Sequence, residues 1–592
     1  MQWRQWLRQI LDPSASFQEQ TFTLGDRGQQ PAAEEQGPFR LKDAEARTQR
    51  VLTHIDSILE AVPLGEAAMK KAGDLTPDLD ENRRRLEALF RMPENKDLII
   101  RELQVATQPP TRAVVCFMEG LSDKTIINRD ILQPLMLLAH LDHHLDGQRE
   151  SGPTQFTVDV IIQRLLPGHQ VSEKHSLKEV AEALLMGDTV LLFEGQRTAI
   201  TVETKEPPVR SISEPKSEQS IQGPHDSFVE AFRMNVAMIR RRLKDPRVVT
   251  EILTVGQVSS TFVALMYIDG IVNPKLVAEV KQRVDGIKVD TLNDVGVLAQ
   301  FIEDAPASLM PGSLTTERPD RAAAYLAEGH VALIVDNSPY ALIFPITFWS
   351  LLQTSEDYYL RFPFGTFLRF SRLAALLTSL LVPAFYIALV NYHQEMLPTE
   401  LMLFVAASRE AVPMPAILEL VIMEVTFELI REAGTRIPNV LGSAISLVAS
   451  LILGQAAVEA RIVSPLLIVV VAITGLASFA LPNFLDSFAI RMLRFVLLIA
   501  AAFLGFYGLA AGLFILILYL SSMRSMGVPY LAPLAPRMRG AADTILQPPA
   551  YTMEFRPRHV RPMDERRQKP ITRPWDPRSR AAEEERDRGG RP

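Results

Sequence analysis

Cysteine is nearly absent from this 592-residue sequence, and so are the motifs of the common enzyme classes. The single cysteine, Cys116, excludes an intramolecular disulfide and a cysteine-rich metal site. The sequence has no phosphate-binding loop, no glycine-rich dinucleotide turn, no His-Glu-x-x-His pair and no nucleophile elbow. We therefore expect a protein that is not an enzyme and that uses no cofactor.

A strong charge imbalance is also absent. The formal net charge of −7 is modest for this length, and no DNA- or RNA-reading motif is present, so we expect no nucleic-acid partner. The first residues lack the unbroken apolar core of a signal peptide. The N-terminal region is therefore expected to stay on the cytoplasmic side.

One cluster of side chains has the spacing of a metal site. His140, His143 and His144 share a helical face, with Asp142 and Asp146 beside them. Histidines on the surface of a helix are far commoner than metal ligands. We therefore expect no bound metal here.

What the sequence does have is a concentration of apolar residues in its last third. Several runs reach the length of about 20 residues that a helix needs to cross the hydrocarbon core of a membrane. This pattern predicts a multi-span helical membrane domain over residues 361–525. The runs are Leu373–Tyr392, Val440–Val458, Ile462–Pro482 and Phe495–Leu520.

A further apolar segment, Leu401–Ile430, carries several carboxylates. Ionisable groups at membrane depth cost about 3 kcal/mol or more each, so they indicate a polar pathway or a network of ion pairs. Prolines and Ser408-Arg409-Glu410 interrupt the segment. Five crossings would place the basic C-terminal tail opposite the N-terminal region. Four crossings, with 401–430 re-entrant or interfacial, would place both ends on the cytoplasmic side, and the interruptions favour this second topology slightly.

The carboxylates of this segment continue along one helical face with Arg431 and Glu432. The face fits the lining of a pore and, equally, an internal network in which Glu428 pairs with Arg431 or Arg436. The candidate ion-pathway residues are Glu419, Glu424, Glu428, Gln455 and Glu459, with Glu424 and Glu428 as the first choices.

Small residues recur every four positions along another apolar run. Such a stripe lets two helix backbones approach closely, because packing drives helix association in lipid. We expect these residues to pack against a second helix of the membrane domain. They are Gly442, Ser446, Ser450 and Gly454.

The region before the membrane domain contains a repeated pattern. The apolar strand Ala113–Met118 is followed by Glu119-Gly120, and Phe262–Ile268 is followed by Asp269-Gly270. Glycine suits the tight turn after each strand. We expect two related α/β lobes with the same core topology. Arg83–Phe90 and Leu98–Val105 are interpreted as helices that precede the first of these strands.

The fold class predicted from these patterns is α+β with an α-helical membrane domain. Composition divides the chain into six parts. These are a mostly disordered N-terminal extension (1–79), lobe 1 (80–205), a linker (206–222), lobe 2 (223–360), the helical membrane domain (361–525) and a disordered basic tail (526–592).

At this point a set of motifs identifies a resemblance. In this order, between about residues 85 and 535, the chain resembles the A subunit of GerA-type spore germination receptors, including stage V sporulation protein AF. The matching stretches include Gly223-Pro224, Tyr267-Ile268-Asp269-Gly270-Ile271, Thr316-Glu317-Arg318-Pro319-Asp320, Glu356-Asp357-Tyr358-Tyr359, Arg431-Glu432-Ala433-Gly434-Thr435-Arg436-Ile437-Pro438, Gly454-Gln455-Ala456-Ala457-Val458 and Gly527-Val528-Pro529-Tyr530.

The resemblance implies an integral protein of the spore inner membrane whose N-terminal domain faces the spore core. It implies work with a transporter-like B subunit and a lipoprotein C subunit, and assembly into a homo-oligomeric ring in membrane lipid. It also implies that the ring is a germinant-gated channel that releases cations at the start of germination. A secondary transporter and a stage V AF-like accessory or scaffold protein are the alternatives.

The chain departs from the family's pattern at two places. His225 and Asp226 follow the Gly-Pro pair where an Arg-Glu-like pair is expected. Arg461 stands where the family tends to have glycine, just before the Ser464-Pro465 turn. The second departure puts the details of a pore mouth or of gating in doubt.

Overall fold

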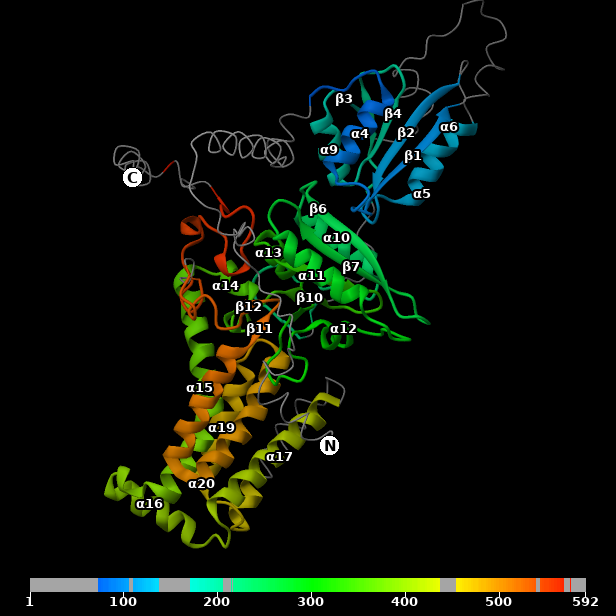
Figure 1. Cartoon of the computed structure of the whole chain (residues 1–592). Coiled ribbons are helices and arrows are strands. Elements are labelled where there is room, and N and C mark those ends of the chain that lie inside the picture. Colours follow the sequence, from blue (N-terminus) through cyan, green and yellow to red (C-terminus); the bar gives the residue numbers. More distant parts are fainter. Residues whose placement is uncertain are drawn as a thin grey trace, which may run out of the picture.

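The structure is a computed structural model that describes residues 73–105, 110–137, 171–205, 214–215, 217–436, 454–538, 543–568 and 575. Lobe 1, lobe 2 and a helical domain follow one another along the molecule (Figure 1). The histidine cluster at 140–144 and most of the predicted N-terminal extension lie outside the described residues. Among the described residues, no group of three or more His, Cys, Asp or Glu side chains is placed to hold a metal ion.

Lobe 1 is a five-stranded sheet with the strand order β1-β2-β4-β5-β3, and every strand pair is antiparallel. Helices α4 and α9 pack on one face of the sheet, around a core that includes Leu86, Val114 and Leu184. The strands are β1 (Leu98–Val105), β2 (Thr111–Met118), β3 (Val171–Lys174), β4 (Thr189–Phe193) and β5 (Ala199–Val202). The helices are α4 (Leu79–Leu89), α5 (Lys124–Ile126), a π-helical turn (Ile127–Leu132), α6 (Gln133–Leu137) and α9 (Leu177–Met186).

Lobe 2 repeats this arrangement. Its sheet has the equivalent strand order β6-β7-β9-β10-β8, again with antiparallel pairs throughout. The strands are β6 (Val248–Val255), β7 (Thr261–Ile268), β8 (Leu314–Thr316), β9 (Val331–Val335) and β10 (Ala341–Phe344). The helices are α10 (Phe232–Arg242), α11 (Pro274–Asp285), α12 (Val295–Ile302) and α13 (Pro319–Ala327).

The equivalent strand orders agree with the duplication that the repeated pattern predicts. Gly120 after β2 has a φ of 80° and Gly270 after β7 has a φ of 75°, so both turns use the left-handed conformation that favours glycine. The helical interpretation of Leu98–Val105 is wrong, because this segment is strand β1. All eight of its residues pair with β2, and this ladder decides between two patterns that its apolar spacing alone leaves open.

The helical domain begins with α15 (Phe362–Tyr392) and continues with α16 (Thr399–Glu410) and α17 (Ala416–Arg436). Residues 454–459 form a further helical turn, followed by α19 (Pro465–Phe479) and α20 (Phe484–Ser522). Phe362–Tyr392 and Ser487–Ser522 are long and apolar enough to cross a membrane, judged by length and composition. The predicted span Val440–Val458 lies largely outside the described residues, so the number of spans stays a prediction.

Helix α20 folds back on itself, so the apolar run Phe495–Leu520 is not one continuous helix. Gly505 breaks it with φ 61° and ψ −138°, a conformation that only glycine adopts readily. A β carbon at Gly508 would collide with the carbonyl oxygen of Ala500, and one at Gly512 would lie 2.7 Å from Leu497 Cδ2. In a straight helix Gly508 would lie more than about 10 Å from Ala500, and Gly512 would lie further still from Leu497. The two arms of α20 are therefore antiparallel.

The return arm of α20 delivers the chain to lobe 2. The Tyr519 hydroxyl lies 2.6 Å from Ser308 Oγ, and Ser525 Oγ donates to the carbonyl oxygen of Gly312 at 2.6 Å. The short strands β11 (Arg524–Ser525) and β12 (Val528–Pro529) follow, and Tyr530 is fully buried. The helical domain is thus fixed to lobe 2 at both ends of its sequence.

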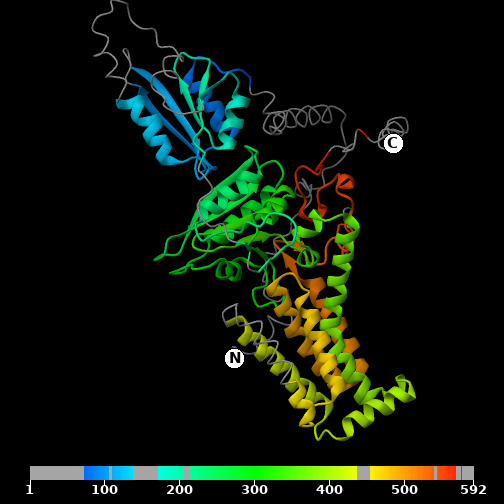
Figure 2. The same ribbon diagram turned by 180° about the vertical axis from the view of Figure 1, so that it is seen from behind.

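The prediction of a disordered tail from residue 526 is wrong for residues 526–538 and 543–568. Residues 543–568, here called the C-terminal segment, lie beside lobe 2 and the start of α15, as both views show (Figures 1 and 2). This segment includes two 3-10 turns, Ala550–Thr552 and Arg558–Val560. Its order comes from hydrogen bonds with lobe 2 and α15 instead of from an apolar repeat of its own. The C-terminal segment and lobe 2 therefore lie on the same side of the helical domain.

Candidate functional site

Three motifs that are far apart in the sequence meet at the first turn of α13. Arg318 forms a two-point ion pair with Asp320, at 2.9 and 3.1 Å, and donates to the carbonyl oxygen of Pro224 at 3.0 Å. The Tyr359 hydroxyl donates to the same Asp320 carboxylate at 2.7 Å. Gly223 lies so close to the Tyr359 ring that a β carbon there would lie 2.5 Å from it. The three motifs therefore form one contact, in which Arg318 and Asp320 are buried.

Titration of this contact follows from its geometry. Burial favours the neutral form of Asp320, but hydrogen bonds from Arg318 and Tyr359 outweigh that effect and hold its pKa below the usual value. Burial and the hydrogen bond to Asp320 together raise the pKa of Tyr359. At neutral pH the carboxylate is therefore charged and the phenol keeps its proton, as the hydrogen bond requires.

The end of the predicted linker packs against the same turn. Glu218 forms an ion pair with Arg321 at 2.8 Å and accepts a hydrogen bond from Thr316 Oγ1 at 2.6 Å. Both charged side chains of this pair are buried, at 5% and 8% exposure. Ser217 donates from its hydroxyl to Glu317. Residues 217–222 thus belong structurally to lobe 2.

Helix α14 (Ser355–Tyr359) carries the contact onward to the first membrane-length helix. Asp357, which is fully buried, pairs with Arg369 at 3.2 Å and with Arg372 at 2.8 Å, both on α15. Arg321 of α13 also donates to the carbonyl oxygens of Ser350 and Gln353, just before α14. A movement of α13 would therefore be transmitted to α15 through buried ion pairs.

A cavity of about 410 Å³ lies at this junction. Its wall combines Glu218, Arg318 and Arg321 with Glu356 and Arg372, and the loop between α19 and α20, residues 479–482, closes one side. Lobe 2, α14, α15 and the later membrane helices all contribute to this cavity. It is the point where the soluble and helical parts share a polar surface.

The carboxylates predicted for an ion pathway lie in α17, where they meet arginines. Glu424 forms an ion pair with Arg494 of α20 at 2.8 Å, and both side chains are 1% exposed. Glu428 pairs with Arg491 of α20, and its second oxygen lies 3.8 Å from Arg431. The predicted alternative of an ion-pair network that includes Glu428 and Arg431 therefore describes the contacts within this chain.

The sequence analysis missed Arg491 and Arg494 as partners of these carboxylates. Their signal was present, since two arginines three positions apart interrupt an otherwise apolar helix. Glu419 is also buried, 3.5 Å from Arg409, and accepts a hydrogen bond from the backbone nitrogen of Ser464 at 3.0 Å.

The other candidate residues lie apart from this network. Gln455 and Glu459 are exposed on the surface of this chain. Among the described residues, no atom lies within 4 Å of the position that a β carbon on Gly454 would take. Gly442, Ser446, Ser450 and Pro438 lie outside the described residues, so close packing of the small-residue stripe stays a prediction. Arg431, Glu432 and Gly434 all lie in α17.

Both departures from the family's pattern have a structural account. Asp226 accepts two hydrogen bonds from Arg242, at 2.5 and 2.6 Å. Arg461 has a φ of 56°, in the left-handed region that favours glycine.

The basic run Arg240-Arg241-Arg242 at the end of α10 is not exposed to solvent along its whole length. Arg240 is 1% exposed and joins the lobes through an ion pair with Asp97 of lobe 1.

Two soluble lobes joined to helices of membrane length define a membrane-associated class of protein. A family model described as "Bacillus/Clostridium GerA spore germination protein" matches residues 85–559, so the chain belongs to the GerA family. The resemblance that the motifs indicate is therefore confirmed.

Individual relatives cover most of the chain. It is 39% identical over 507 residues to spore germination protein KA of Bacillus subtilis strain 168, which covers 86% of this chain and 91% of that protein. It is 36% identical over 469 residues to spore germination protein GerLA of Bacillus cereus, with coverage of 79% and 93%. A crystal structure of the N-terminal domain of the A subunit of the Bacillus megaterium spore germinant receptor GerK3 is 27% identical and covers 47% of this chain and 98% of that chain, with a TM-score of 0.35.

Proposed function

We propose that this chain is the membrane subunit of a spore germinant receptor and that copies of it assemble into a ring around a cation path. Its place would be the spore inner membrane, with the lobes on the core side. It would act with a transporter-like B subunit and a lipoprotein C subunit. Membership of the GerA family supports the role in germination.

One observation carries the proposal of an ion path. Gln455 and Glu459 are exposed polar side chains on a helical domain whose outer surface is largely apolar, and a passive anchor has no need of them. On this chain both are placed where they could face a shared axis. Repeating an acidic side chain around such an axis would concentrate negative potential and favour cations. Glu424 and Glu428 would then hold α17 against α20 instead of lining the path.

The coupling between lobe and path would pass through the α13–α14–α15 junction. Tyr359 of α14 donates to Asp320 of α13, and Asp357 of α14 pairs with Arg369 and Arg372 of α15, so polar contacts link lobe 2 to the first membrane-length helix. A nutrient signal that displaced lobe 2 would therefore move α15 directly. This gives a germinant-dependent gate a physical route.

The test is electrical. The purified full-length chain, alone and with its partner subunits, would be reconstituted into planar bilayers under a potassium chloride gradient. A cation-selective current supports the channel. A flux that requires a co-substrate gradient and gives no steady current would indicate the secondary transporter, which intramembrane charges also suit. Assembly with partner subunits without any flux would indicate the scaffold.

A further inference from the structure

The C-terminal segment adds a set of contacts between lobe 2 and the start of α15, which also meet through α13, α14, the end of α20 and an apolar core that includes Leu351, Leu352 and Leu376. On α14 and α15, Asp543 accepts hydrogen bonds from Tyr358 at 2.8 Å and from Arg369 at 2.7 Å. Gln547 lies against α15, where its backbone nitrogen donates to Thr366 Oγ1 at 3.1 Å. A β carbon on Gly365 would collide with the Gln547 side chain and lie 2.9 Å from the carbonyl oxygen of Asp357, so the segment packs closely on α15 here.

On lobe 2 the same segment contacts the turns next to α13 and α11. Arg556 donates to the carbonyl oxygen of Ala327 at 2.8 Å, and Arg567 pairs with Glu328 at 3.0 Å. The backbone nitrogen of Met563 donates to the carbonyl oxygen of Ile271 at 2.8 Å. The first residues of the C-terminal segment thus contact α14 and α15, and its later residues contact lobe 2.

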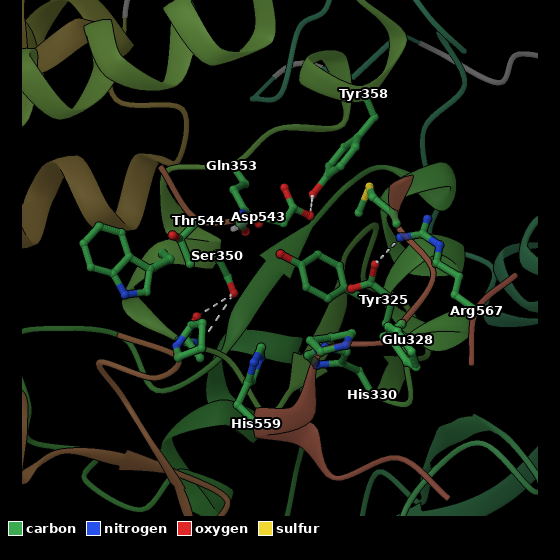
Figure 3. Close-up of a pocket in the computed structure, with 16 residues that line it drawn as sticks. Tyr325, Glu328, His330, Ser350, Gln353, Tyr358, Asp543, Thr544, His559 and Arg567 are labelled. Carbon is green, nitrogen blue, oxygen red and sulfur yellow. Dashed lines mark hydrogen bonds and ion pairs between the residues drawn. The ribbon is translucent and has the colours of Figure 1, made fainter. Parts of the chain in front are cut away.

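Between its contacts with α15 and its contacts with lobe 2, the segment covers a small cavity of about 60 Å³ that is lined in part by polar side chains (Figure 3). His330 of lobe 2 and His559 of the segment face each other there, with ring centroids 6.3 Å apart. His559 Nδ1 is buried without a hydrogen-bond partner in the described structure. A cavity of this size and polarity has room for water. The interface is therefore incompletely packed.

The chemistry of the interface distinguishes it from a permanent core. Several of the segment's large apolar side chains are partly open to solvent, since Leu546, Tyr551 and Phe555 are 60%, 45% and 56% exposed. Val560 and Pro562 are its buried apolar side chains in the described structure. Polar contacts with little apolar burial are typical of elements that open locally at a small cost in free energy.

We propose that residues 543–568 form a releasable clasp that holds lobe 2 against the start of α15, and that its release frees lobe 2 to move relative to the helices. The clasp is a device of the fold and does not depend on whether the chain conducts ions. Asp543 is its key residue on the α15 side, because it holds Arg369 and Tyr358 together. Arg369 keeps Asp357 as a partner when the clasp opens, so the junction itself stays paired.

The experiment cuts the chain just before the clasp, so that only noncovalent contacts can hold the clasp on the rest of the protein. Residues 539–542 of the full-length protein are replaced by a protease recognition sequence, the detergent-solubilised protein is cut, and retention of the C-terminal fragment is followed by gel filtration. Hydrogen exchange is measured over 355–370 in parallel. Asp543→Ala is compared with Glu565→Ala, which removes an exposed pair with Arg558 inside the segment and leaves its contacts with lobe 2 and α15 unchanged.

We expect the wild-type and Glu565→Ala fragments to stay bound after cleavage. Asp543→Ala should weaken retention roughly tenfold, the scale of losing charge-assisted hydrogen bonds. Exchange over 355–370 should rise in step with fragment loss. The proposal is overturned if the wild-type fragment leaves on cleavage, if the two variants retain it equally, or if fragment loss leaves exchange at 355–370 unchanged.

Discussion

The carboxylate of Glu424 and the guanidinium of Arg494 lie 2.8 Å apart, and each side chain is 1% exposed. They join α17 to the first arm of α20 inside an apolar domain. Removing one partner of a buried pair leaves an uncompensated charge, which typically costs about 3–5 kcal/mol. Replacing both partners leaves no uncompensated charge.

We therefore predict that Glu424→Gln and Arg494→Gln each lower expression and thermal stability, and that the double variant recovers most of the loss. The check is a double-mutant cycle of detergent melting temperatures. If Glu424→Gln instead folds normally and changes ion selectivity, the carboxylate faces a pore and the ion-pair interpretation is wrong.

The predicted role of Glu459 gives the opposite pattern. Because Glu459 is exposed on the chain, Glu459→Gln should leave stability within about 0.5 kcal/mol of wild type. If it lines a cation path, the same change should lower cation selectivity in reconstituted bilayers. Glu410→Gln is the matched control, since Glu410 is also exposed, at the end of α16. If both variants and the wild type have equal cation selectivity, Glu459 does not line the cation path.

The sequence predicted the soluble lobes better than the helical domain. Strand–acid–glycine turns are local signals, and the two lobes do have equivalent strand orders. Strand β1 was misread because the spacing of its apolar residues fits both secondary structures, and only its pairing with β2 decides. The hairpin in α20 was missed because glycines are common in membrane helices, and nothing local marks Gly505 from its neighbours.

The candidate site shows the same limit. The Arg318–Asp320 pair is two residues apart and lies within one motif, but Glu424 and Arg494 are brought together only by the packing of α17 on α20. The C-terminal segment has a composition typical of disorder, and its order depends on backbone acceptors that lobe 2 supplies. Contacts of this kind leave no periodic pattern in the sequence.

Arg461 gives a prediction about backbone strain. Its φ of 56° lies in the left-handed region, which costs a residue with a β carbon roughly 1 kcal/mol. Arg461→Gly should therefore stabilise the protein slightly or leave it unchanged, although glycine substitutions at ordinary backbone angles destabilise. Arg461→Ala should give no such gain, since alanine keeps the β carbon. Melting temperatures of the two variants check this, and a clear loss in the glycine variant would contradict it.

Gly505 should tolerate almost no replacement. Its backbone angles are accessible to glycine only, and a β carbon there would lie 2.9 Å from His393 Cε1 and 3.0 Å from Tyr392 Cβ. We predict that Gly505→Ala destabilises the domain by about 2 kcal/mol or more and disturbs the hairpin. Gly454→Ala is the control, because no atom of the part of the chain that the structure describes lies within 4 Å of its β-carbon position. Similar melting temperatures for both variants would show that α20 does not fold back at Gly505.

The clasp should respond to pH through its two histidines. Burial lowers the pKa of His330 to about 3 and that of His559 to about 4, from an ordinary value of 6.5, so both rings are neutral when the clasp is closed. The open clasp exposes His559 and binds the extra proton more readily. The histidine contribution to closure is therefore fully present above about pH 6.5 and is lost as the pH falls from there toward about 4. Glu328 in the same cavity acts in the opposite direction, because burial raises its pKa to about 7 and its protonation favours closure as the pH falls. The histidine contribution is isolated by comparison with His559→Gln, which cannot take up the proton: relative to this variant, wild-type retention of the cleaved fragment should decline between about pH 6.5 and about 4. The same dependence on pH in both proteins would exclude His559 as the cause.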